Sequence, residues 1–184
     1  MATAAVTKIS DTLSPLDGDR SAPVRGLPST AAIAGHPIHP MMIPYPVAFL
    51  TSAVATDLAA RRTGDPFWAR ASSVLLGAGI VGGLGAAVFG AIDYYTIARA
   101  REKKTGKLHA IGNPIALGIA AVSLAMRRGR TNEPPSGGAT ALAGLTAGLV
   151  AATGWAGAEL SYRHMVGVVG HDDQHDHEEK QLVS

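Results

Sequence analysis

Four long apolar runs, uncharged except for Asp57 near the end of the first, constrain this chain more than any other feature. Each run has about the 20 residues that a helix needs to cross the hydrocarbon core of a bilayer. None has the polar face that recurs every 3.6 residues in a soluble amphipathic helix. Only 16% of the 184 residues are charged, while 47% are hydrophobic. The sequence therefore predicts four transmembrane helices, at about residues 41–60, 71–92, 108–126 and 138–158.

Polar segments flank these four spans. Residues 1–30 are rich in Ser, Thr, Ala and Pro and lack the apolar core of a secretory signal, so we expect a disordered leader. Residues 170–184 mix acids with histidines and cannot bury a core, so we expect a disordered tail. The predicted fold class is all-α, a polytopic membrane four-helix bundle over residues 31–169, between this leader and an acidic, histidine-rich tail.

Several function classes are excluded or disfavoured. The chain has no cysteine, which excludes disulfides, thiolate metal sites and cysteine-ligated iron–sulfur clusters. The net charge of +2 is small and the basic residues lie in short loops, so we expect no nucleic-acid partner. Residues 77–82 match G-x-G-x-x-G, but the strands of a dinucleotide-binding unit are missing around them. The bilayer is the partner that composition predicts.

The loop charges give little information on orientation. Basic residues near the membrane are evenly divided between the two faces, so the positive-inside rule has little to act on. The densest cluster, at residues 99–107, lies on the side of both termini. We therefore expect a multi-pass protein of the cell membrane with cytoplasmic termini.

All four histidines outside the tail are expected on one membrane face. They lie before the first span, at the start of the third and after the fourth, and successive spans run in opposite directions. Two carboxylates end the second and fourth spans on that same face. The candidates there are His36, His39, His109, His164, Asp93 and Glu159.

These side chains suit a metal or haem. Neutral imidazole binds iron, copper and zinc, and two histidines suffice as axial ligands of haem b. Asn113 lies one helical turn after His109, where a residue that orients the imidazole is expected. The spacing of Glu159 and Arg163 also suits an ion pair. The prediction is haem b or a transition metal on the four histidines, with Asp93, Asn113 and Glu159 as supporting or proton-carrying groups.

Three further expectations concern neighbouring segments. The prolines of residues 36–40 favour an extended, polyproline-like strip that presents both of its histidines on one side. Asp57, alone near the opposite face, is expected as an interfacial helix-end charge. The tail histidines could chelate a divalent ion, but a solvated tail is the simpler interpretation; they are His171, His175 and His177.

The chain resembles a family of prokaryotic membrane proteins grouped as domain of unknown function twenty-two thirty-one. The resemblance implies a four-helix membrane domain without an established activity, whose relatives are sometimes joined to Rieske or cytochrome c modules, which implies electron transfer. The chain departs from the usual pattern at Ala158 and Met165, where glycine is common. The motifs that carry the resemblance are residues 35–41, 44–46 and 90–93, His109 with Asn113, and residues 154–160 and 162–168.

Three functions remain open at this point, and the sequence does not say whether the protein is an enzyme. The leading hypothesis is electron transfer through a bound haem or metal, with a redox protein as partner. The alternatives are a non-catalytic membrane accessory subunit, whose polar layer is structural and whose loops and tail dock a partner, and a proton or metal-ion carrier.

Overall fold

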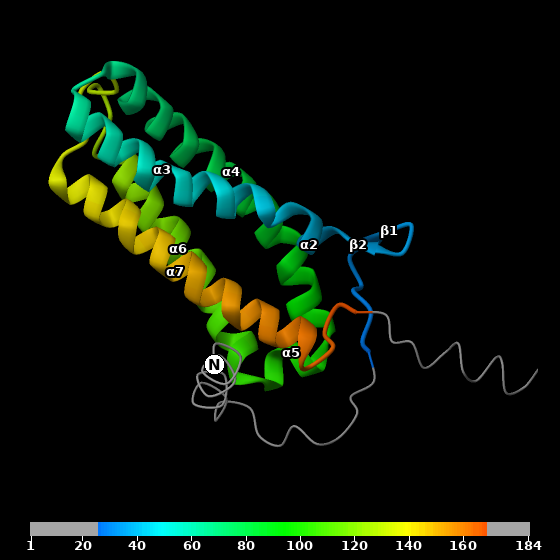
Figure 1. Ribbon diagram of the computed structural model, residues 1–184. Helices are drawn as coiled ribbons and strands as arrows, with labels where there is room; N and C mark the ends of the chain where they lie inside the picture. The colour runs from blue at the N-terminus through cyan, green and yellow to red at the C-terminus, as the bar shows by residue number, and fades with distance from the viewer. Residues whose placement is uncertain (1–25, 169–184) are drawn as a thin grey trace, which may run out of the picture.

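The computed structural model describes residues 26–168, and most of them are helical (Figure 1). The expected leader lies mostly outside this range, and the tail with its three histidines lies wholly outside it. The elements are β1 (Ala32–Ile33), β2 (His36–Pro37), α2 (Ile38–Met42), α3 (Pro44–Thr63), α4 (Pro66–Thr96), α5 (Ala98–Glu102), α6 (Lys104–Ala125) and α7 (Gly137–Tyr162).

Four helical segments are long and apolar enough to cross a membrane, and they confirm the predicted four-helix membrane bundle. The first combines α2 and α3, and the others are α4, α6 and α7. Local signals explain several of their ends. Asp65 caps α4 by accepting a hydrogen bond from the amide of Phe67 (2.8 Å), and Ser136 caps α7 through the amide of Ala139 (3.2 Å). Gly64 ends α3 with a φ of 70°, which favours glycine.

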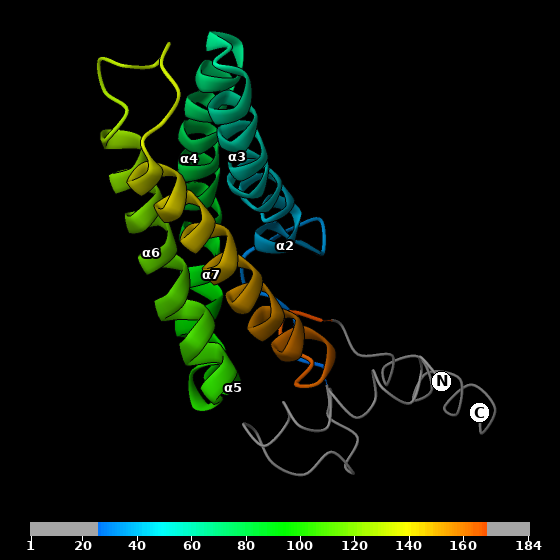
Figure 2. The same cartoon turned by 60° about the vertical axis from the view of Figure 1, so that its left-hand side comes forward.

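The helices form two hairpins that pack side by side. α3 pairs with α4, and α6 pairs with α7, while α3 also contacts α7 and α4 contacts α6. Figure 1 shows the α3–α4 and α6–α7 connections together at one end of the bundle, and Figure 2 shows the two hairpins next to each other. The core between them is built from small and aliphatic side chains, so the helix backbones approach closely.

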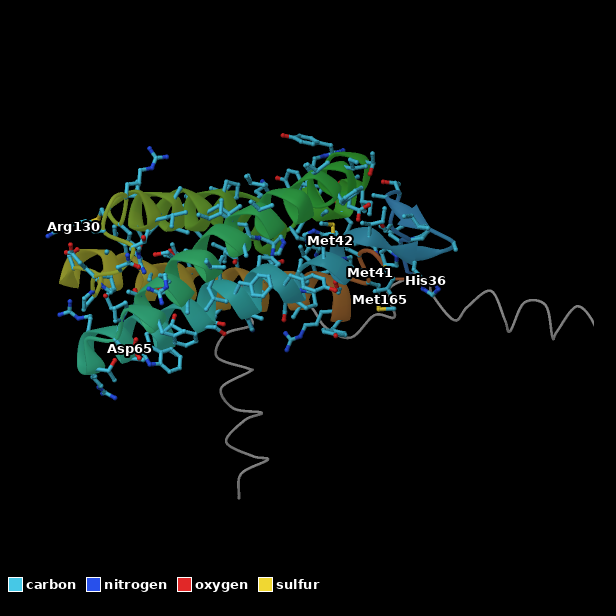
Figure 3. The ribbon with its side chains drawn as sticks, turned by 90° about the horizontal axis from the view of Figure 1, so that it is seen from above. His36, Met41, Met42, Asp65, Arg130 and Met165 are labelled. Atoms are coloured by element: carbon cyan, nitrogen blue, oxygen red, sulfur yellow. The ribbon has the colours of Figure 1, made fainter. Side chains whose placement is uncertain are left out.

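Short elements cover the other end of the bundle. Figure 3 shows His36, Met41 and Met165 at this end, and Asp65 and Arg130 at the opposite one. Leu27 donates its amide to Met165 (2.9 Å) and accepts from Gly167 (2.7 Å), which joins the first described residues to the segment after α7. We call this end, with α2, β1, β2 and α5, the histidine end.

The structure corrects the prediction of one extended histidine-proline strip. His36 does lie in extended backbone, in β2, but His39 is the second residue of helix α2. The reason is the position of Pro40 in the first turn of that helix, where the missing proline N–H would have had no helical partner anyway. The two histidines therefore do not share one side of a strip.

Candidate functional site

Two of the predicted histidines come together at the histidine end. His39 on α2 and His109 near the start of α6 have ring centroids 5.8 Å apart, with the ring planes perpendicular. Both side chains are half-buried. One histidine comes from each hairpin, so this histidine pair lies at the boundary between the two halves of the bundle.

Each imidazole is held by a backbone carbonyl of the second helix in its own hairpin. His39 Nδ1 lies 2.8 Å from the carbonyl oxygen of Ala86 on α4, and His109 Nδ1 lies 2.8 Å from that of Thr153 on α7. Because a carbonyl oxygen only accepts, each Nδ1 must carry the proton, and a neutral ring then has its lone pair on Nε2. Within residues 26–168, neither Nε2 has a hydrogen-bond partner.

A glycine allows each ring to lie directly on its neighbouring helix. A Cβ atom added at Gly90 would be 2.9 Å from Nδ1 and Cε1 of His39, and one added at Gly157 would be 2.8 Å from the same atoms of His109. These distances are too short for a real side chain. Gly90 and Gly157 are therefore part of the site, although neither has a side chain to contribute.

Asn113 supports the second histidine indirectly. Its Nδ2 donates to the backbone carbonyl of His109 (2.9 Å), and its Oδ1 accepts from the hydroxyl of Thr153 (2.7 Å). The carbonyl of Thr153 is the group that orients the His109 ring. Asn113 thus links the backbone of His109 on α6 to Thr153 on α7, whose carbonyl orients the ring. Asn113 does not contact the ring nitrogens itself.

The family described as "Predicted membrane protein (DUF2231)" matches residues 35–170. The chain belongs to this family. The match includes all four helices and the histidine pair, and it agrees with the resemblance carried by the histidine-proline and Gly-Trp-Ala motifs. No curated protein and no solved structure matches the chain.

The other predicted site residues at the histidine end have different surroundings. His36 is exposed in β2. Among the described residues, the Asp93 carboxylate accepts hydrogen bonds from residues 29–31, where Ser29, the amide of Thr30 and the amide of Ala31 donate to it. Asp93 therefore anchors the segment before β1.

Two further candidates, Glu159 and His164, lie at the end of the fourth span and just after it. Glu159 forms an ion pair with Arg163 (2.8 Å), as the spacing indicated. The backbone carbonyl of His164 accepts from Arg99 at 2.9 Å. Within residues 26–168, no three His, Asp or Glu side chains converge as a metal-binding group. Any centre on the histidine pair would thus have two protein ligands from the predicted set.

The prediction for Asp57 was wrong. Its side chain is fully buried and forms a bidentate ion pair with Arg127, at 2.5 Å and 2.7 Å. Ser72 donates to the carboxylate and accepts from Arg127, and Ser123 accepts from the same guanidinium at 3.0 Å. Hydropathy and charge along the chain gave no sign of this buried polar cluster, because its members come from three different helical segments. It lies at the end of the bundle away from the histidines.

Proposed function

We propose that this membrane protein holds one metal centre between Nε2 of His39 and Nε2 of His109, and that it passes electrons through that centre to a redox partner. The first candidate for the centre is the iron of haem b, and the second is a single transition-metal ion. The observation that supports this proposal is the pair of imidazoles whose Nδ1 atoms are both bonded to backbone carbonyls.

The bonding of Nδ1 is the arrangement common among metal-ligating histidines. Such a histidine donates its other ring N–H to a carbonyl or carboxylate, which fixes the tautomer and the ring orientation. The observed spacing also suits a shared metal. With metal–nitrogen bonds of about 2 Å, ring centroids 5.8 Å apart leave both imidazoles within reach of one ion.

His39 and His109 would hold such a centre from the two hairpins. A haem held there by both histidines would supply the gain and loss of one electron. His39 and His109 would both remain attached during that change, because their positions are fixed by α4 and α7. Little reorganisation of the protein would be needed.

The interior of the bundle disfavours the carrier alternative. Between the histidine pair and the Asp57–Arg127 pair, the core is mainly apolar, and the hydroxyl of its buried Thr146 is bonded to the carbonyl of Leu142 (2.9 Å). A proton or ion pathway would need polar groups or water through this layer. The core residues there are Leu50, Ala53, Leu76, Ala116, Ala120 and Val150.

The test is the optical spectrum of the full chain purified in mild detergent after expression with added iron and haem precursor, recorded oxidised and reduced, together with metal analysis. We expect a Soret band that shifts on reduction, or one metal ion per chain. His39→Ala and His109→Ala should each abolish the signal. The matched control is His36→Ala, which removes an exposed histidine from the same segment and should leave the signal unchanged.

The results separate the candidates. A Soret band assigns haem, whereas stoichiometric metal without one assigns an ion. A folded, colourless and metal-free protein would refute the proposal and leave the accessory-subunit alternative, in which the two carbonyl bonds simply tie the helices together.

The proposal includes the cell membrane as location and cytoplasmic termini, supported by the basic cluster at residues 99–107. Labelling of single cysteines placed in each loop tests that orientation.

A further inference from the structure

We infer that the chain consists of two copies of one helical hairpin. We also infer that an ion pair between equivalent positions makes each copy pack against the other rather than against a second copy of itself. The first copy comprises α2, α3 and α4, and the second comprises α6 and α7. In Figure 1, α3 and α6 start at the same end and run in the same direction. This arrangement is that of parallel repeats related by a two-fold axis along the membrane normal. The inference goes beyond the proposed metal site and does not depend on it.

Both hairpins build their histidine in the same way. In each, the histidine of the first helix bonds through Nδ1 to a carbonyl of the second helix, and its ring lies on the glycine one turn after that carbonyl. A proline follows the histidine at the same spacing in both copies. The equivalent residues are His39, Pro44, Ala86 and Gly90 in the first hairpin, and His109, Pro114, Thr153 and Gly157 in the second.

The pattern of burial repeats in the same register. Counted from its histidine, each hairpin buries side chains at the same four positions along its first helix, with Arg127 in the turn directly after α6. The second helix of each buries five positions at a common spacing as well. The first-helix sets are Pro46, Leu50, Ala53 and Asp57 against Ala116, Ala120, Ser123 and Arg127. The second-helix sets are Ser72, Leu76, Gly79, Gly83 and Ala86 against Ala139, Ala143, Thr146, Val150 and Thr153.

One hydrogen bond joins the same two positions in both copies with donor and acceptor exchanged. In the first hairpin, the hydroxyl of Ser72 on the second helix donates to the carbonyl of Ala53 (3.3 Å). In the second hairpin, Ser123 occupies the position of Ala53 and donates to the carbonyl of Ala139, which occupies the position of Ser72 (2.7 Å). A repeat explains this coincidence, because the two backbones must lie equally close there.

Equivalent residues face each other across the boundary at both ends of the bundle. At one end the pair is His39 with His109, and at the other it is Asp57 with Arg127. The second pair is the point where the copies differ in charge. Two copies of either hairpin alone would bury two carboxylates or two guanidiniums against each other, which is strongly unfavourable. The ion pair thus makes the first hairpin select the second.

The first test exchanges the charges in the full chain. Asp57→Arg and Arg127→Asp, made singly, should each lower the yield of monodisperse, helical protein by about tenfold or more, because each leaves like charges buried together. The double variant should recover most of that loss. Recovery is expected if the two positions are equivalent, because each new side chain then occupies a position equivalent to the one that holds the same residue type in the wild-type protein.

The second test exchanges the whole cluster, and it distinguishes a repeat from a simple ion pair. If the hairpins are equivalent, moving the hydroxyls together with the charges should restore the yield to within about twofold of wild type. If the variant that carries all six substitutions, the two charge exchanges and four more, folds as poorly as Asp57→Arg alone, the inference is overturned. The added substitutions are Ala53→Ser, Ser123→Ala, Ser72→Ala and Ala139→Ser.

A third measurement does not depend on the ion pair. The chain has no cysteine, so pairs can be introduced cleanly. Gly83 on α4 lies directly on the Leu117 side chain of α6, where an added Cβ would be 2.6 Å away. The two-fold relation makes Val150 and Val47 the equivalent pair on α7 and α3. Gly83→Cys/Leu117→Cys and Val47→Cys/Val150→Cys should therefore both cross-link in membranes.

The matched control is Val81→Cys/Ile115→Cys, on the same helices as the first pair but with side chains that are 71% and 51% exposed. This pair should not cross-link within one chain. Cross-linking of the first pair combined with control-level cross-linking of Val47 and Val150 would overturn the two-fold relation. Equal cross-linking of both pairs supports it.

Discussion

Replacing Gly157 by Ala should loosen the histidine pair, although alanine is the better helix former. The added methyl would lie 2.8 Å from Nδ1 and Cε1 of His109, so the ring must move by several tenths of an ångström away from α7. Overpacking of this kind costs about 1–3 kcal/mol, and weakening of the Nδ1 bond to Thr153 about 1 kcal/mol more. The gain in helix propensity offsets about 1 kcal/mol, which leaves a net destabilisation of about 2 kcal/mol.

The assay is thermal unfolding in detergent, followed by circular dichroism, together with the metal content of the same preparations. About 2 kcal/mol corresponds to a decrease of about 4–8 °C for a chain of this length. Gly154→Ala is the matched control, because Gly154 lies one turn earlier in α7 with open space where its Cβ would be. That variant should be as stable as wild type or more so. Equal melting temperatures for the two variants would refute the role of Gly157 in seating the ring.

Three further outcomes follow from single contacts. Asp93→Ala removes the acceptor that anchors residues 29–31, so protease cleavage before β1 should become several-fold faster while the helix content is unchanged. Gly106→Ala places a methyl on the carbonyl oxygen of Ala100 and should cost about 3 kcal/mol of stability, whereas Gly118→Ala, in open space on the same helix, should cost none. Thr153→Val removes the hydroxyl bond to Asn113 and should cost about 1 kcal/mol, yet it keeps the carbonyl that orients His109, so any bound metal should remain.

The helices were predictable because their signal is local. The length of an apolar run and the charge that ends it are both read from consecutive residues, and the structure places a helix on each predicted span. Sequence reasoning also placed His39 and His109 on one face, since that needs only the alternating direction of successive spans. It gave no reason to prefer these two over His36, which proved to lie on an exposed strand.

The remaining features depend on contacts between distant segments. The acceptors for both imidazoles are backbone carbonyls, which every residue possesses, so no residue type marks Ala86 or Thr153. The burial of Asp57 depends on Arg127, which belongs to the other hairpin and resembles the exposed arginines beside it in the chain. The sequence signal that points to both pairs is a repeated spacing. The interval from histidine to proline is the same in both halves of the chain, and so is the interval from histidine to the buried charge.

The prolines near the histidines bear on how the bundle deforms. Pro114 lies inside α6, one turn after His109, and its missing N–H leaves a carbonyl one turn earlier without its helical bond. Pro44 lies at the start of α3, at the same distance from His39. Helices bend most readily at such points. Both histidine-bearing turns are thus joined to the rest of the bundle at a proline, while the bidentate ion pair links the two hairpins at the opposite end, so we expect the histidine end to bend more readily than the other.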